Sequence, residues 1–347
     1  MGLLSEALVA IDGSKFKAVN NRDKNFTAHK VKARQKQLED SVQRYLEELD
    51  RADREPGLVP PARVERLKEK IATVKAQARQ LAKIEKELPN TPDEQISLTD
   101  PDARSMATSG RGTGIVGYNV QAAVDTEHHL IVAHDVTNEG HDRQQLAPMA
   151  DKAKDALGTK KVTVLADRGY YNGEQIRCCD QAGITALVPK PMTSNNRAAG
   201  LFDKRDFVYD AKRDEYRCPA GERAIWRFKN EERGLVLHHY WTSACPGCSI
   251  RSQCTTSNYR RISRWEHEDV LDRMQAQLER MPLASRLRRQ TVEHAFGTLK
   301  AWMGSTHFLT KTLPKVRTEM SLHVLAYNMK RAISIVGVQP LIEFMKA

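Results

Sequence analysis

The chain has 347 residues, of which 40% are hydrophobic, and a formal charge of +11 at pH 7. This length allows two domains, or one domain with large insertions. The charge favours a polyanionic partner, nucleic acid first, because each phosphate neutralised by Lys or Arg releases counterions; the alternative is a merely soluble basic protein. No apolar run reaches transmembrane length, and no basic segment leads into an apolar one at the N-terminus. We therefore expect a cytoplasmic protein without a membrane partner, in which clustered cysteines are metal ligands more often than disulfides.

The first predicted strand leads into an aspartate. A short apolar run, 7–11, is followed by Asp12-Gly13, and the alternation Lys15-Phe16-Lys17 continues the strand. Read alone, Asp-Gly is a turn. As the partner of a second aspartate at a strand end, Asp12 is a candidate metal ligand.

Residues 29–88 have the spacing of two amphipathic helices. The first stripe comprises Leu38, Val42, Tyr45 and Leu49, and the second comprises Val64, Leu67, Ile71, Val74, Ala78 and Leu81. These 3-4 spacings place apolar side chains on one face of each helix. The Pro- and Gly-rich break at 56–61 turns the chain back. The pattern predicts an antiparallel helical hairpin, either a structural or DNA-facing arm or a dimerisation element.

Alternating strands and helices follow this hairpin. Residues 118–125 and 128–136 predict two strands turning at Thr126-Glu127. Asp142 is a suitable N-cap for a helix that runs to about 157. The remaining predicted elements are a strand at 162–167, a helix at 173–182 and a strand at 184–188. This order predicts an α/β sheet interrupted by the helical segment.

The strand at 162–167 ends in the second candidate carboxylate. Its β-branched, uncharged residues suit a strand buried on both faces. Asp167 then lies where the sheet meets solvent, the edge at which open α/β sheets hold their ligands. Gly169 allows a sharp exit from the strand. A solvated turn aspartate is the alternative reading.

Residues 190–285 contain a cysteine pattern. Cys218 belongs to a remote Cys-Pro knuckle, and Cys245, Cys248 and Cys254 lie within ten residues of one another. Four thiols suit tetrahedral zinc, although the spacing is not that of two symmetrical Cys-x-x-Cys knuckles. The alternative is four unliganded cysteines, some of them buried.

An amphipathic helix over 287–302 supplies the third carboxylate. Arg289, Glu293 and Lys300 are spaced by four and seven residues, which places them on one side of a regular α-helix. The alternative is an ordinary exposed ion pair between Arg289 and Glu293. A last apolar helix is predicted over 313–336.

Two aspartates at strand ends and one helical glutamate suit divalent cations. Mg²⁺ prefers carboxylate oxygens and keeps open positions for water and phosphate. Two such ions about 4 Å apart can activate the attacking oxygen and stabilise the leaving oxygen during displacement at phosphorus. Asp12, Asp167 and Glu293 are therefore candidate catalytic ligands of two Mg²⁺ or Mn²⁺ ions in a basic protein that acts on DNA.

Three short motifs resemble the signatures of bacterial insertion-sequence DDE transposases. They are Ile11-Asp12-Gly13-Ser14-Lys15, Ala166-Asp167-Arg168-Gly169-Tyr170, and Arg289 followed by Glu293 and Lys300. The chain is most similar to the IS-eleven-eighty-two family, which is related to the IS-four and IS-five groups. Residues 99–104, 117–121 and the cysteine segment also resemble that family, so the resemblance extends over nearly the whole chain.

The resemblance implies an RNase H-like α/β core, a helical-hairpin insertion after the first strand and a Cys-rich, zinc-binding insertion before the last catalytic helix. The core would comprise 1–18 and 112–190, the insertions 19–111 and 191–285, and the C-terminal helices 286–347. The resemblance also implies cleavage and strand transfer at terminal inverted repeats, near the nucleoid, by at least a homodimer. Arg168, Arg289, Lys300 and Tyr170 would face DNA; Tyr170 and Tyr171 would either stack on a base or pack beside the site.

Two departures from the family pattern bear on activity. Related groups carry Tyr three residues before the Arg, where this chain has Arg286. Members also carry an N-terminal helical region for end recognition, and we expect it to be missing here. A truncated copy would fold and bind metal without finding its inverted repeats. The alternatives to a working transposase are an inactive DNA-binding remnant and a stand-alone nuclease.

Overall fold

A computed structural model describes residues 3–4, 8–19, 24–54, 60–91, 93–107, 114–191 and 195–346. Contacts between residues divide the chain into two compact units. The first comprises Met1–Asp12, Ala123–Ala133 and Asp142–Val292; the second comprises Gly13–Ala122, His134–His141 and Glu293–Ala347. The domain boundaries predicted from the sequence separate a core from its insertions instead, and they remain a prediction.

The core of the first unit is a parallel sheet covered by helices. Strand β1 (Leu8–Lys17) pairs in parallel with β7 (Val162–Leu165), which pairs in parallel with β8 (Ile184–Leu187). Because three of the four β7 side chains are buried, this strand is enclosed on both faces, as its uncharged sequence predicts. The surrounding helices are α3 (Leu146–Leu157), α4 (Gly173–Gln181) and α5 (Glu268–Arg280). They contribute Met149, Ile176 and Met274 to the buried cluster that the strands form.

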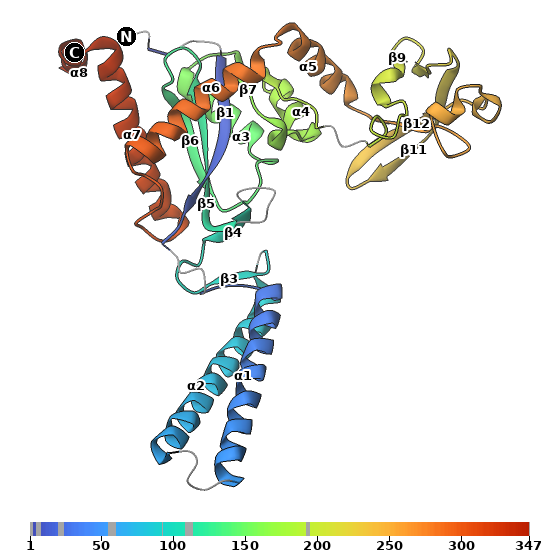
Figure 1. The fold of residues 1–347 in the computed structure, drawn as a ribbon. Helices are drawn as coiled ribbons and strands as arrows, with labels where there is room; N and C mark the ends of the chain where they lie inside the picture. The colour runs from blue at the N-terminus through green and yellow to red at the C-terminus, as the bar shows by residue number, and fades with distance from the viewer. Residues whose placement is uncertain are drawn as a thin grey trace. The chain divides into compact units, whose positions relative to one another are not determined.

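The first unit also contains an antiparallel sheet, which the sequence left without predicted strands. Its order is β13-β12-β11-β10-β9, visible on the right of Figure 1. The strands are β9 (Val208–Asp210), β10 (Glu215–Arg217), β11 (Arg223–Glu232), β12 (Leu235–Trp241) and β13 (Ile262–Trp265). Phe207, Tyr216 and Tyr240 lie at the centre of its own small core.

The second unit contains two long helices, α1 (Ala28–Arg54) and α2 (Pro61–Glu87), where the periodicity predicts helices. Figure 1 shows them side by side. Val31, Leu38 and Leu81 are among the residues buried between them. Strand β2 (Asn25–Thr27), just before α1, and strand β3 (Gln95–Ser97), after α2, form a two-stranded antiparallel sheet. This sheet holds together the chain segments that lead into α1 and out of α2.

The rest of the second unit is built on strands and C-terminal helices. Its elements are η2 (Leu88–Asn90), β4 (Arg104–Ala107), the first part of β5 (Gly114–Asp125), the second part of β6 (Ile131–Thr137), a π-helical turn η7 (Thr298–Trp302), α7 (Leu313–Val336) and α8 (Val338–Lys346). The larger sheet has the order β4-β5-β1-β7-β8, with β6 on β5. Strands β1, β5 and β6 each pass from one unit into the other.

A close approach of two strands explains one glycine of the second unit. A Cβ on Gly117 would lie 2.0 Å from the carbonyl oxygen of Phe16, so no larger residue fits at this position without separating the strands. The ring of Phe16 packs against Phe308 at 5.7 Å between centroids, and Tyr118 meets Phe308 edge to face at 5.8 Å.

The predicted mixed α/β class is confirmed, and one helix start is wrong. Helix α3 begins at Leu146 with Gln145 as its N-cap, so Asp142 does not cap it. The chain first makes a turn in which the N–H of Gln145 donates to the carbonyl of Asp142. None of the described helices is long and apolar enough to cross a membrane.

Candidate active site

The first two predicted carboxylates belong to neighbouring strands of the first unit: Asp12 lies within β1, and Asp167 comes just after β7. In the parallel pair of β1 and β7, Ala10 is opposite Leu165. Asp12 and Asp167 each come two residues after this pair, so both reach the same edge of the sheet. Asp167 also caps the short 3₁₀ helix η3 (Arg168–Tyr170), because its Oδ1 accepts the N–H of Gly169 at 2.7 Å.

Gly169 brings a third carboxylate to this edge. A Cβ on Gly169 would lie 2.9 Å from Oδ1 of Asp167 and 3.8 Å from Oδ2 of Asp142. Both carboxylates therefore lie against the bare backbone of one glycine, and a larger residue would displace Asp167. The sequence reading assigned Asp142 to a helix cap and missed it here; the available signal was an aspartate between a strand and a helix, the same setting as Asp167.

Tyr170 is fully buried, close enough to these aspartates for their charges to affect its pKa. Burial raises the pKa of its hydroxyl well above the usual value, and the charges of Asp142, Asp12 and Asp167 raise it further, while Arg288 opposes them. The hydroxyl therefore stays protonated at physiological pH. Because the ring belongs to the buried core cluster, the structure favours packing over base stacking for Tyr170.

Arg288 provides a positive charge in this cluster. It lies on helix α6 (Ala284–Gly297), and its Nη1 is 3.0 Å from Oδ2 of Asp12, as an ion pair rather than a well-aligned hydrogen bond. Arg289, the residue that the sequence singled out, is exposed, as is Arg168. Helical spacing alone did not distinguish two adjacent arginines, and Arg288 was missed for that reason.

Glu293 and Lys300 belong to the second unit. Glu293 is exposed on α6. Lys300 is half-buried, and its ammonium donates hydrogen bonds to Oγ of Ser14 at 2.6 Å and to the carbonyl of Lys15 at 2.9 Å. Burial lowers the pKa of Lys300. Since α6 gives way to π-helical η7 after Gly297, the seven-residue offset from Glu293 no longer measures two regular α-helical turns.

The carboxylates have the right chemistry for Mg²⁺ but not the arrangement of a ligand set. Asp12, Asp167 and Glu293 supply the oxygen donors that hard divalent cations prefer. Within the described part of the chain, however, no group of three or more His, Cys, Asp or Glu side chains is placed to hold a metal ion. In this structure Asp12 is neutralised by Arg288 instead.

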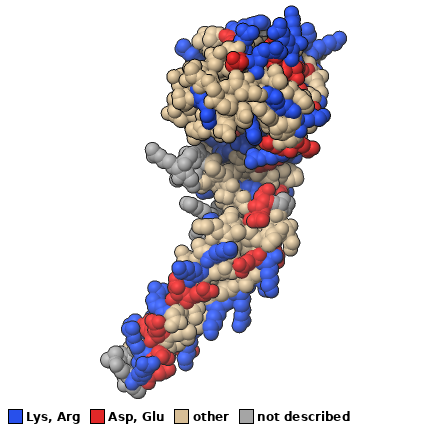
Figure 2. Space-filling view, turned by 90° about the vertical axis from the view of Figure 1, so that its right-hand side faces the viewer, with Lys and Arg blue, Asp and Glu red and all other residues tan. Residues whose placement is uncertain are grey.

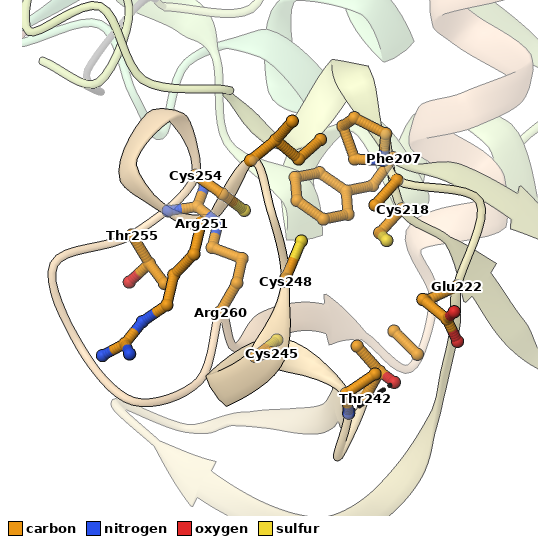
Figure 3. A pocket seen from close by; sticks show the side chains of 15 residues that line it. Phe207, Cys218, Glu222, Thr242, Cys245, Cys248, Arg251, Cys254, Thr255 and Arg260 are labelled. Carbon is orange, nitrogen blue, oxygen red and sulfur yellow. Dashed lines mark hydrogen bonds between the residues drawn. The ribbon is translucent and has the colours of Figure 1, made fainter.

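The four cysteines of the predicted zinc site line one cavity of about 30 Å³ in the first unit. Figure 3 shows their sulfur atoms around the same hollow, next to Phe207. Burial raises the pKa of the Cys254 thiol, and the other three thiols raise it further against the opposing effect of Arg260. Because these described thiols do not form a ligand set either, the structure does not support zinc.

Comparison with known proteins adds a family match. Residues 88–329, well over half of the chain, match the family model described as "Transposase DDE domain". The matched range includes Asp142, Asp167 and Glu293; it begins after Asp12 and after helices α1 and α2. Comparisons with curated proteins and with solved structures found no match.

Proposed function

The chain belongs to the DDE transposase family, and from this premise we propose that it cleaves DNA at the inverted repeats of an insertion sequence and transfers the cut strand to target DNA. The observation that carries the proposal is the family match over 88–329 together with two aspartates at the same edge of neighbouring strands. In finer detail, the sequence motifs support a member similar to the IS-eleven-eighty-two family with an RNase H-like core, and joining two ends requires at least a dimer.

Asp12, Asp167 and Glu293 are the residues that we propose to hold two Mg²⁺ or Mn²⁺ ions. When bound, such ions activate the attacking oxygen and stabilise the leaving oxygen of a phosphodiester. The assignment of Glu293 rests on its place in the motif shared with Arg289 and Lys300.

The chain's own side chains have separate tasks in this proposal. Arg288 forms an ion pair with Asp12 and orients its carboxylate. Tyr170 is buried near the three aspartates, and its protonated hydroxyl adds no further negative charge to them. Arg168 and Arg289 are exposed, so they can contact phosphate oxygens on either side of the scissile bond.

A DNA-binding protein without catalysis is the second candidate. Two observations favour it: Asp12 is already paired with Arg288, and the described carboxylates are not placed as a metal-ligand group. In that case the basic charge of +11 would bind DNA and no strand would be cut. A stand-alone nuclease would cut DNA without strand transfer.

Cleavage of a labelled DNA end distinguishes these functions. The wild-type chain is compared with Asp167→Asn and Glu293→Gln in Mg²⁺ and in Mn²⁺, and Asp151→Asn, an exposed carboxylate on α3, is the matched control. Metal-dependent nicking that both triad variants abolish and the control retains supports the enzyme, and a joined product separates a transposase from a nuclease. Equal DNA binding by all four proteins without nicking would refute the enzyme and leave the binding protein.

A further inference from the structure

The antiparallel sheet of the first unit packs one face against its small core, and its other face points away from that core. Ser263 on β13 and Arg261 just before it are exposed while Ile262 and Arg264 are buried, so alternate side chains point to opposite faces. The register places Ile225 opposite Trp241, and Ser263 opposite His239. These pairs define an outer face across three neighbouring strands.

A β-bulge concentrates side chains on this outer face. The pairing of β11 with β12 shifts between Trp226 and Phe228, so Arg227 is an extra residue in its strand. Strict alternation would turn Phe228 toward the core. Because a bulge shifts the alternation by one residue, Arg227 and Phe228 both lie on the outer side, and each contacts the Trp241 ring.

On this face, the Trp241 ring lies between the guanidinium groups of Arg227 and Arg261. The guanidinium of Arg227 is 5.4 Å from the centroid of the Trp241 ring, and that of Arg261 is 5.5 Å away. Phe228 meets Trp241 edge to face at 5.9 Å and stacks on His239 at 4.6 Å. Arg227 also donates to the carbonyl of Trp241 at 3.2 Å and to Oγ of Ser243 at 3.0 Å, which fixes its orientation.

We call the residues Ile225, Arg227, Phe228, Trp241 and Arg261 the arginine–aromatic face. Ile225 is 40% exposed and Phe228 is 39% exposed, so apolar area remains open to solvent between charged groups. Figure 2 looks at the molecule from the side of this sheet and shows more Lys and Arg than Asp and Glu there.

Two acidic residues border the face, and each is near an arginine. Asp210 is opposite Glu215, and its Oδ2 is 4.0 Å from Nε of Arg213. Glu215, which is opposite Ile225, is buried, and its carboxylate is bound by Arg223 at 2.6 Å. The open part of the face is therefore positive and aromatic. Such a surface attracts phosphates and offers rings on which bases stack.

We propose that the arginine–aromatic face binds single-stranded DNA, with Phe228 stacking on an unpaired base and Arg227 and Arg261 contacting the backbone. An unpaired strand is the specific partner because only unpaired bases present their faces to a protein ring. The choice of DNA rests on the proposed function, whereas stacking itself requires neither a metal ion nor Glu293.

The test is a binding titration without metal, in EDTA, followed by fluorescence anisotropy of a labelled oligonucleotide. Three probes are compared: a single strand, the same strand with abasic sites, and the duplex. Phe228→Ala is expected to weaken binding of the single strand about fivefold or more, the lower end of the contribution of one stacked base, with little change for the abasic strand. Phe228→Trp should restore binding, because it restores the ring.

Arg261→Glu is expected to weaken both the intact and the abasic strand and to lower the salt dependence, because it removes a phosphate contact. The matched controls are Tyr259→Ala and Lys212→Glu, an exposed ring and an exposed cation of the same subdomain outside the face. Both should bind as the wild type does. Circular dichroism of each variant establishes that the sheet is folded.

Three results would overturn the inference: no binding of the single strand by the wild type, no effect of Phe228→Ala, or equal losses on the intact and abasic strands. Asp167→Asn is titrated in parallel and is expected to bind normally. If cleavage fails while Phe228→Ala still discriminates the probes, the proposed function is wrong and the face remains. If cleavage succeeds and Phe228→Ala binds normally, the proposed function stands and the single-strand-binding face is wrong.

Discussion

Replacing Lys300 by methionine removes a partly buried charge while keeping most of the side chain. The ammonium makes two hydrogen bonds to β1, with Ser14 at 2.6 Å and the carbonyl of Lys15 at 2.9 Å, and it lies 4.4 Å from the centroid of the Phe16 ring. A hydrogen bond with a charged partner contributes about 1.5–3 kcal/mol, and a cation–π contact about 0.5–2 kcal/mol. Desolvation of the ammonium offsets part of this, so we expect the free energy of unfolding to fall by about 2–3 kcal/mol.

Urea denaturation measures this loss, and amide exchange in β1 locates it. Lys315→Met, an exposed lysine on α7, is the control and should leave both unchanged. DNA cleavage is measured on the same proteins. If Lys300→Met unfolds at the wild-type urea concentration and loses only cleavage, the contacts with β1 contribute nothing net. Lys300 would then be a DNA contact alone, as the sequence motif suggests.

Three further outcomes can be measured. Gly117→Ala should destabilise the fold by about 3 kcal/mol or more in thermal unfolding, because the added Cβ would lie 2.0 Å from the carbonyl oxygen of Phe16; Gly297→Ala, where a Cβ meets nothing within 4 Å, should be neutral or stabilise by up to about 1 kcal/mol. Burial raises the pKa of Glu319, but hydrogen bonds from a hydroxyl and two backbone N–H groups lower it by more, so the net pKa lies below 4.5. This carboxylate therefore stabilises the fold above pH 4.5, and the stability difference between wild type and Glu319→Gln should shrink as the pH falls below that value. A constant difference would contradict the shift. Asp142→Asn should reduce metal-dependent cleavage about 10- to 100-fold at limiting Mg²⁺ and less at saturating Mg²⁺; an equal loss at every Mg²⁺ concentration would show that Asp142 does not support the metal site.

Helical periodicity predicted the two long helices of the second unit, but it overestimated their burial. Of the predicted stripes, Leu38, Leu67, Ile71 and Leu81 are buried. Tyr45 and Leu49, farther along α1, are half-buried. Two helices alone form a narrow interface that leaves part of each stripe open to water, and a stripe in the sequence does not reveal how many neighbours will cover it.

The position of Asp167 just after β7 could be predicted, because an uncharged strand shows where its polar end begins. Asp12 also follows an apolar run, but β1 continues through it to Lys17. Arg288 could not be predicted, because its role depends on which way a helix turns. Asp142 carried a signal, an aspartate between a strand and a helix, but its place beside Asp167 depends on where a loop returns. The β11 strand illustrates the same limit: its alternation pattern would bury Phe228, and the bulge at Arg227 reverses that outcome. Local patterns do not encode a one-residue shift in pairing.

The small β2–β3 sheet makes the α1–α2 pair a self-contained insertion in the fold. Phe26 pairs with Ile96, so the chain leaves the fold and returns to it at neighbouring points. The length of the helical pair is thereby uncoupled from the geometry of the larger sheet, and whole turns can be added or removed in matched positions of both helices. A tight turn joining Thr27 to Gln95 would close the gap as an ordinary β-hairpin. A chain with the same core can therefore carry a longer or shorter helical pair between β2 and β3. An engineered reporter domain can also replace α1 and α2 at this position.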